Sequence, residues 1–314
     1  MRVIAIEEHF NTEELLASSG RSFGRTILSK LLDVDHGRLA EMDAAGIDLA
    51  VLSPNAPSVQ MLAGGLAVDL AIATNDHLAE VVAEHPDRFA GFATVPTPDP
   101  AGSVAELERA VNDLGFRGAI IHGHTSGRFL DESVFWPILE CAESLGVPIY
   151  LHPAPPPAAV MSAYYSGLGE EVGRALSMGA WGWHVETGMH ALRLVVAGVF
   201  DRFPKLQFIL GHMGENIPFS LARADSVLNR VTANLEHPVA HYFHRNFHLT
   251  TSAYVTAPPL LCALAVFGAD RIMFSVDYPF SDGAEATHFL RSAPISPADL
   301  EKIAHSNAEA LLDL

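Results

Sequence analysis

The chain has 314 residues, of which 49% are hydrophobic and 18% charged, so it can bury a large core. Its net charge of −18 repels phosphate backbones and anionic lipid, which excludes nucleic acid and membrane surfaces as expected partners. No apolar run approaches the ~18 residues of a membrane span, and no signal peptide precedes Glu7. Cys141 and Cys262, each in an apolar helical pattern, predict buried free thiols. We therefore expect a cytoplasmic protein.

Short apolar runs bounded by turn residues recur along the chain and are typical of buried strands. In chain order the predicted strands are residues 2–7, 48–53, 89–95, 117–122, 147–152, 206–212, 246–252 and 271–277. Helical patterns separate most of them. The predicted helices are residues 36–47, 68–89, 102–115, 131–146, 183–204 and 257–268, and a last helix covers residues 296–314.

Alternation of strands and helices over eight units predicts a parallel sheet closed into a (β/α)8 TIM barrel, built as a single domain over residues 1–314. An open doubly wound sheet is the alternative. That fold usually carries a glycine-rich phosphate turn after its first strand, and here the turn reads "EEHF" without glycine. The stretch "PAPPPAAV", residues 153–160, predicts a loop over the barrel mouth.

Metal-ligand or acid–base residues stand at several predicted strand ends. They are Glu7 and His9, His152, His212, and Asp277. The carboxyl ends of barrel strands meet at one mouth, where active sites lie. Glu7 and His9 are two residues apart and share one face of their strand, whereas Glu8 points the other way and is expected to be structural. A single histidine of this kind is usually an ordinary hydrogen-bonded core residue, but their coincidence at several strand ends favours a metal site.

The donor set of Glu7, His9, His152 and Asp277 offers two imidazoles and two carboxylates, whose formal charge balances a divalent cation. Such nitrogen and oxygen ligands suit Zn²⁺ or Mn²⁺. The fourth strand ends "AIIHGH" and supplies no lysine that could be carboxylated to bridge two metals. The sequence therefore predicts one divalent ion, Zn²⁺ or Mn²⁺.

His212 and Glu215 are three residues apart in "GHMGEN". If a helix begins at Met213 or Gly214, Glu215 lies in its first turn and can reach back to the imidazole. A carboxylate partner raises the basicity of a histidine and fixes its orientation, so the pair predicts an acid–base dyad. The alternative is that Glu215 only complements the positive end of that helix.

Several motifs carry a resemblance that covers nearly the whole chain. They are "IEEHF" (6–10), "LSPNAPSVQ" (52–60), "RFAGFATVP" (88–96), "NDLGFRGAI" (112–120), "YLHP" (150–153), "ETGMHALRL" (186–194), "ILGHMGE" (209–215), "FSVDYPF" (274–280) and "SNAEALL" (306–312). Together they resemble the amidohydrolase superfamily, in its branch of metal-dependent non-oxidative decarboxylases. The E-x-H opening is similar to the resorcylate-type enzymes, whereas the aminocarboxymuconate semialdehyde decarboxylases carry H-x-H.

The resemblance implies roles for particular residues. It implies that Glu7, His9, His152 and Asp277 bind the metal and that Asp277, assisted by His212 and Glu215, protonates the substrate. It also implies a substrate site, expected to consist of Phe10, Asn55, Arg223, Tyr278 and Phe280. A homodimer or homotetramer is expected. The chain departs from resorcylate-type enzymes at Ala154, where they carry an arginine, and in "HGHTSGRF".

The resemblance implies decarboxylation of a hydroxylated aromatic carboxylate, a small-molecule substrate, by ring-carbon protonation followed by loss of CO₂. Metal-dependent hydrolysis of a lactone or amide, or a hydratase reaction, is the alternative, because the same ligands could activate water. A non-catalytic binding protein is a third class, which predicts that the chain holds no metal and tolerates Glu7→Ala and His152→Ala.

Overall fold

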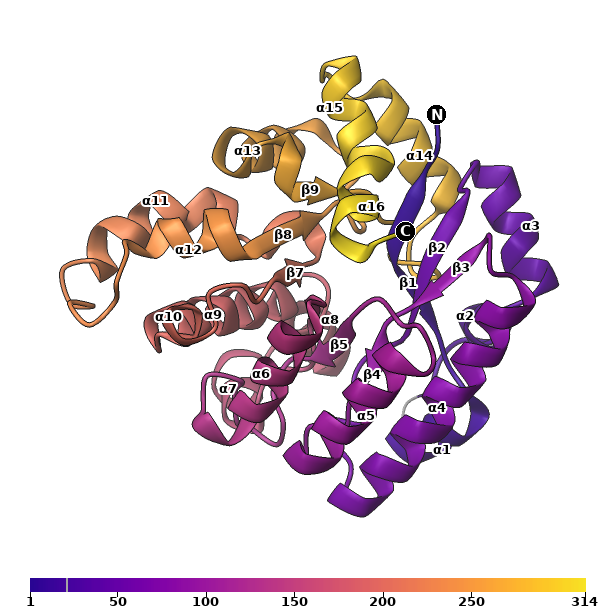
Figure 1. Cartoon of the computed structure of the whole chain (residues 1–314), viewed down its shortest axis with the longest axis horizontal. Helices are drawn as coiled ribbons and strands as arrows, with labels where there is room; N and C mark the ends of the chain where they lie inside the picture. Colours follow the sequence, from indigo (N-terminus) through magenta and orange to yellow (C-terminus); the bar gives the residue numbers. More distant parts are fainter. Residues whose placement is uncertain (21) are drawn as a thin grey trace.

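The computed structural model describes residues 1–20 and 22–314, in which strands lie at the centre and helices surround them (Figure 1). The strands are β1 (Ile4–Phe10), β2 (Leu49–Pro54), β3 (Phe89–Gly91), β4 (Ala93–Thr94), β5 (Ala119–His122), β6 (Ile149–His152), β7 (Phe208–Leu210), β8 (Phe247–Thr250) and β9 (Ile272–Met273).

Helices follow the strands around the molecule. They are α1 (Glu13–Ser19), α2 (Arg25–Leu32), α3 (His36–Ala45), α4 (Gly64–Glu84), α5 (Pro100–Asn112), α6 (Trp136–Leu145), α7 (Ala158–Tyr164), α8 (Glu170–Ser177), α9 (Gly182–Val196), α10 (Val199–Arg202), α11 (Ile217–Leu228), α12 (Val239–Asn246), α13 (Ala257–Phe267), α14 (Gly283–Ser292), α15 (Pro297–Glu301) and α16 (Asn307–Leu312). Within the described residues, none is long and apolar enough to cross a membrane.

The strands pair in parallel with their sequence neighbours, from β1 to β3 and from β4 to β9. β3 and β4 are two parts of one predicted strand, and the N–H of Phe92 between them donates to the carbonyl oxygen of Leu52 at 3.0 Å. The ring closes where Glu8 forms a parallel bridge with Tyr278 and the His9 N–H donates to the Tyr278 carbonyl oxygen at 2.8 Å. The predicted strands and the barrel are therefore confirmed.

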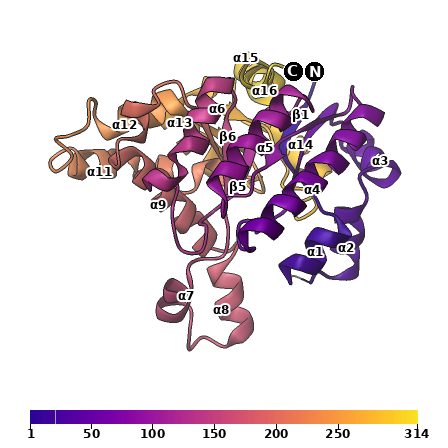
Figure 2. The same ribbon diagram turned by 60° about the horizontal axis from the view of Figure 1, so that its bottom comes forward.

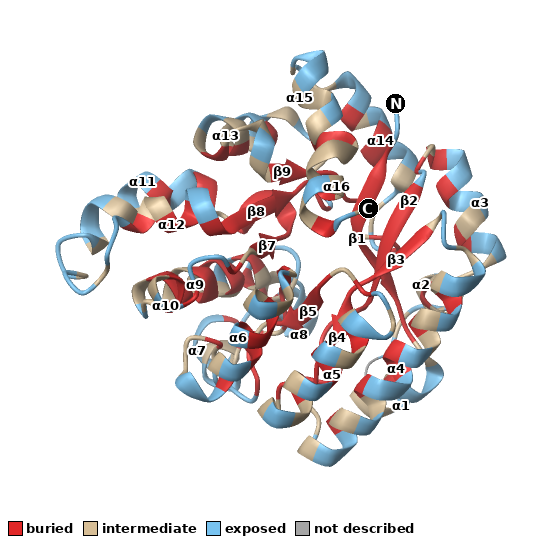
Figure 3. Ribbon diagram, viewed as in Figure 1, coloured by how far each residue is buried: buried red, intermediate tan, exposed pale blue. Residues whose placement is uncertain are grey.

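Alternate strand residues face two separate apolar cores, and the strands are almost wholly buried (Figure 3). The inner core contains Ile4, Ile6, Leu49, Val51, Phe92, Ile120, Tyr150, Ile209 and Met273, together with Ala308 and Leu312 of α16. The helix α16 therefore covers one end of the barrel interior. The outer core lies between strands and helices.

The register of β1 against β2 shifts between Ala5 and Glu8, which is the signature of a β-bulge. After the shift, Glu7 and His9 face the barrel interior, while Glu8 and Phe10 face outward. Glu8 accepts hydrogen bonds from the Val276 N–H at 2.9 Å and the Ser275 hydroxyl at 3.3 Å, and burial raises the pKa of Glu8 to about 8. Glu8 thus links β1 to the segment after β9, at the seam where the barrel closes, in keeping with the structural role expected for it.

An excursion between β6 and α9 projects from the barrel (Figure 2). The predicted loop at residues 153–160 ends early, because α7 begins at Ala158, and α8 follows. Two further expectations are also revised. The last predicted helix is divided into α15, a π-helical turn (Lys302–Ser306) and α16. Cys141 is buried as predicted, but Cys262 is only partly buried.

Candidate metal centre and acid–base site

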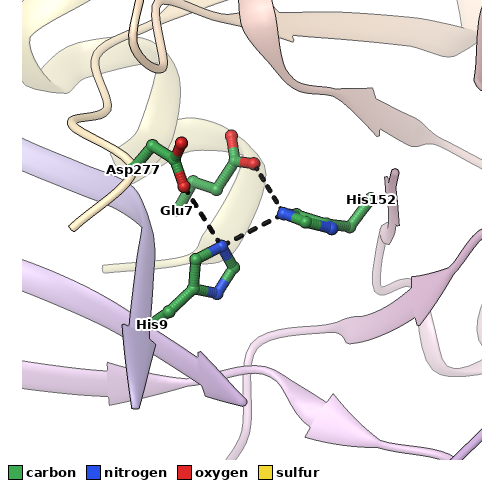
Figure 4. A group of neighbouring side chains, drawn as sticks. All are labelled: Glu7, His9, His152 and Asp277. Carbon is green, nitrogen blue, oxygen red and sulfur yellow. Dashed lines mark hydrogen bonds and ion pairs between the residues drawn. The ribbon is translucent and has the colours of Figure 1, made fainter. Parts of the chain in front are cut away.

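Four side chains from distant parts of the chain converge at the barrel mouth: Glu7, His9, His152 and Asp277 (Figure 4). One ligand atom from each lies within 4.8 Å of the others. His9 Nε2 lies 3.1 Å from His152 Nε2 and 3.4 Å from Asp277 Oδ1, and His152 Nε2 lies 3.2 Å from Glu7 Oε1. The donor atoms thus face one common point, as the atoms of a metal site must.

The hydrogen bonds around this cluster suit a cation. His152 Nδ1 lies 2.7 Å from the Pro153 carbonyl oxygen, to which it can only donate, so the neutral ring presents a lone pair at Nε2. Glu7 Oε1 is buried and has no hydrogen-bond partner among the described residues. The buried carboxylate of Glu7 beside the partly buried carboxylate of Asp277 would be costly without a cation, and a divalent ion offsets that cost. The residues present therefore fit one divalent ion.

The second oxygen of Glu7 is held from the barrel interior. Tyr150 on β6 and Ser252 after β8 both donate to Glu7 Oε2. The adjacent Gly211 leaves room for this carboxylate, because a Cβ there would lie 2.8 Å from Glu7 Oε2. These contacts fix the direction in which Glu7 Oε1 points.

Glu215 binds two histidines at once. Its Oε1 lies 2.7 Å from His212 Nδ1 and its Oε2 lies 2.7 Å from His184 Nδ1. The helix α11 begins only at Ile217, and Glu215 precedes it with a φ of 52°, so the expectation of a helix starting at Met213 or Gly214 is wrong although the predicted contact forms. The alternative that Glu215 serves only the helix end does not describe these contacts.

His212 stands between this pair and the cluster. Its Nε2 lies 3.7 Å from Asp277 Oδ2 and 3.9 Å from Glu7 Oε1. Burial opposes protonation of His212, but Glu7 and Glu215 outweigh it and raise the pKa of His212 well above its ordinary value. His212 (φ 49°) and Asp277 (φ 71°) both adopt left-handed backbone conformations, a strain that is common where side chains must be aimed at a functional site.

A cavity of about 580 Å³ opens above these residues. Its polar lining includes His9, His152, His184, His212 and Asp277, and its apolar lining includes Ala56, Ala175, Met178, Trp183, Ala253, Tyr254 and Phe280. The helix α8 contributes Glu171 and Arg174. A mostly apolar cleft with a few convergent polar groups is typical of a small-molecule site.

Two of the five predicted substrate residues line this cavity, namely Asn55 and Phe280. The other three lie elsewhere, which corrects that expectation. Phe10 is fully buried in the outer core, because it follows the inward-facing His9 on the strand. The Tyr278 ring stacks against the Arg38 guanidinium, 4.2 Å from ring centre to Cζ, outside the barrel. Arg223 is exposed on α11 and does not line the cavity.

Sequence reasoning missed His184 and the residues of α8. His184 lies on the helix α9 and not at a strand end, so the strand-end pattern could not reveal it. Nothing in the sequence alone pairs His184 with Glu215, 31 positions away.

A parallel barrel with a histidine–carboxylate cluster and a histidine–glutamate pair at its mouth defines a metal-dependent TIM-barrel enzyme. The chain belongs to the amidohydrolase family, whose profile matches residues 32–314. It is 39% identical to the γ-resorcylate decarboxylase of Polaromonas sp. JS666, over 99% of this chain and 98% of that protein.

Solved structures agree with this relationship. A 2,6-dihydroxybenzoate decarboxylase in complex with 2,6-dihydroxybenzoate superposes with a TM-score of 0.92 at 38% identity, covering 100% of both chains. The dihydroxybenzoic acid decarboxylase of Polaromonas sp. JS666, with bound manganese and the inhibitor 2-nitroresorcinol, superposes with a TM-score of 0.92 at 39% identity, covering 100% of this chain and 97% of that one. The resemblance inferred from the motifs is therefore confirmed.

Proposed function

We propose that this protein is a metal-dependent non-oxidative decarboxylase of an ortho-hydroxylated benzoate. The observation that carries the proposal is the convergence of Glu7, His9, His152 and Asp277 beside the His212–Glu215 pair, on the floor of one cavity. The similarity to decarboxylases over the full chain supports it. We propose that these four residues hold one divalent ion, Mn²⁺ or Zn²⁺.

Direct cleavage of the bond between the ring and the carboxylate would leave an unstable aryl carbanion, so the ring carbon is protonated first. When bound, the divalent cation supplies Lewis-acid charge that neutralises and orients an anionic substrate. An ortho oxygen donates electron density to the ring and makes the carbon that bears the carboxylate basic.

The chain's own residues move the proton. Glu215 faces His212 Nδ1 and so leaves Nε2 directed at the cavity, 3.7 Å from Asp277 Oδ2. His212 holds the proton, and Asp277, two strands further around the barrel, passes it to the ring carbon. The bond to the carboxylate then breaks, its electron pair restores aromaticity, and CO₂ leaves. Trp183, Tyr254 and Phe280 provide apolar walls that exclude water.

The test supplies the manganese-loaded protein with 2-hydroxybenzoate and 2,6-dihydroxybenzoate, and measures CO₂ together with the phenol. In D₂O the phenol should carry deuterium at the carbon that bore the carboxylate. The isomer 4-hydroxybenzoate, which lacks an ortho oxygen, is the control and should not react. Hydrolysis of lactones or amides without any CO₂ release from the benzoates would establish the hydrolase alternative.

Asp277→Asn removes the group that passes the proton while it keeps the shape of the side chain. We expect turnover to fall by at least about a thousandfold, with the melting temperature of the apo protein unchanged. Near-normal CO₂ release from this variant would remove Asp277 from its proposed role.

Three further expectations remain predictions. A homodimer or homotetramer is measured by light scattering of the purified protein. The cytoplasmic location and the single-domain organisation are likewise expected from the sequence, and limited proteolysis tests the latter by the absence of a stable fragment.

A further inference from the structure

The cavity above the metal centre has more room than a benzoate ring needs. Its volume is about 580 Å³, within the range of roughly 300–1,000 Å³ that encloses drug-sized ligands. The catalytic groups occupy its floor, which is built from strand ends, while α8 belongs to the excursion that projects beyond the barrel (Figure 2). A ring whose carboxylate lies at the floor therefore leaves space between its far edge and α8.

That space is bordered by one positively charged side chain. Among the described residues that line the cavity, Arg174 on α8 is the only lysine or arginine. Its guanidinium has no hydrogen-bond or ion-pair partner within the described part of the chain. Arg174 is exposed on α8, so its guanidinium is free to contact a ligand in the cavity that it borders. Its planar group of donors matches a carboxylate.

Resting on the proposed function, we propose that Arg174 determines substrate specificity, and that the preferred substrate is an ortho-hydroxybenzoate with a second anionic group on the ring edge away from the reacting carboxylate. The reacting carboxylate lies at the metal centre, and the second anion pairs with Arg174. The apolar side chains of Met178 and Trp183 line the same cavity, where the ring crosses it.

Glu171 provides an internal control for the effect of the Arg174 charge on substrate binding. It lines the same cavity from the same helix, one turn before Arg174, and carries the opposite charge. A general electrostatic effect of α8 would make the loss of either charge change the preference by similar amounts in opposite directions. Direct pairing of an anion with Arg174 predicts a large loss when Arg174 is removed and only a small gain when the Glu171 charge is removed.

The experiment compares 2-hydroxyterephthalate with its 4-carboxamide, which has the same shape at that ring position but no second charge. 4-Hydroxyisophthalate extends the pair to the neighbouring ring position. Each compound is tested on the manganese-loaded protein for CO₂ release and, by calorimetry, for binding. We expect the wild type to prefer a dicarboxylate over the carboxamide by about tenfold in kcat/KM and in Kd.

Arg174→Met should lower kcat/KM for the dicarboxylates by about tenfold, to the level of the carboxamide. Arg174→Lys should keep part of the preference, and Glu171→Gln should keep or slightly increase it. Equal losses for all compounds in Arg174→Met, or no preference in the wild type, would overturn the inference. Arg174 also borders a shallow hollow between α7 and α8, so a lower melting temperature with unchanged selectivity would assign it to packing there and likewise overturn the inference. Selective binding without CO₂ release would contradict the proposed function and leave the role of Arg174 intact.

Discussion

Glu215 holds one imidazole with each of its oxygens, which places it to set the protonation of His212 in the proposed reaction. The His212 ring must present Nε2 to the cavity, and only a fixed partner at Nδ1 enforces that orientation. His184 holds the opposite oxygen of Glu215, and its own Nε2 lies 2.9 Å from the Gly179 carbonyl oxygen. We therefore expect His184 to act on the proposed reaction through Glu215, as a positioning residue.

Replacing His184 by leucine removes the N–H that faces Glu215. The charge of Glu215 then acts on His212 alone, which raises the pKa of His212 further and shifts the alkaline limb of the kcat–pH profile to higher pH. We expect kcat to fall by about tenfold. Asn has an amide nitrogen close to the position of Nδ1, so His184→Asn should recover most of both effects. A profile that is identical in both variants and in the wild type would exclude this role.

At the scale of elements, the site depends on the seam where β1 meets the segment after β9. Arg38 on α3 supports this seam from outside the barrel: its guanidinium donates to the carbonyl oxygen of His9 and stacks on Tyr278, the residue next to Asp277. The two segments that carry His9 and Asp277, proposed metal ligands from opposite ends of the chain, thus contact one buried side chain, which is 2% exposed.

Arg38→Met should weaken Mn²⁺ binding by about tenfold or more, because His9 and Asp277 lose their common support. The electron paramagnetic resonance signal of free Mn²⁺ measures this directly. Arg88→Met is the matched control. Arg88 also donates to backbone carbonyl oxygens, those of Ile47 and Asp48, but it does so before β2, away from the mouth. It should lower stability and leave Mn²⁺ affinity unchanged. Equal Mn²⁺ affinities for the wild type and Arg38→Met would contradict the prediction.

The strands and the cluster of proposed metal ligands could be predicted from the sequence because both depend on local patterns of residues. Buried parallel strands appear as continuous apolar runs, and strand ends must meet at one mouth, so His152 and Asp277 could be brought together without coordinates. Phe10 and Tyr278 each follow a side chain that faces the barrel mouth, so the alternation of side chains along a strand places both outside the barrel. The family resemblance led instead to the expectation that they line the substrate site. The helices α7 and α8 have short, exposed sequences whose shape is set by tertiary contacts, and no periodicity revealed that Arg174 would border the cavity.

At the scale of the whole molecule, buried histidines make stability depend on pH. His190 on α9 accepts a hydrogen bond from the Leu130 N–H at 3.0 Å, so it is neutral at this nitrogen, and burial lowers the pKa of His190 to about 3. The unfolded chain binds a proton near pH 6.5 and the folded chain does not. The stability that the neutral His190 contributes is therefore present above pH 6.5 and is lost as the pH falls toward 3.

His190→Gln keeps an acceptor for Leu130 but removes the titration. Relative to pH 7, wild type should lose up to about 2 kcal/mol more unfolding free energy than this variant at pH 5. Urea unfolding at both pH values provides the measurement. His36→Gln, at a side chain that is 97% exposed, should follow the wild type. Parallel pH dependence of wild type and His190→Gln would show that His190 does not contribute.

The closure of the barrel between its first strand and the segment after its last has a consequence for biosynthesis. Glu7 and His9 leave the ribosome early in synthesis, whereas Asp277 is added roughly 270 residues later. A nascent or truncated chain that ends before Asp277 lacks a complete set of donors, however well its early strands have formed. Tight capture of the cation thus requires that synthesis has passed Asp277 and that the first strand has met the segment after the last one, and loading of shorter chains is disfavoured by the order in which the donors are made.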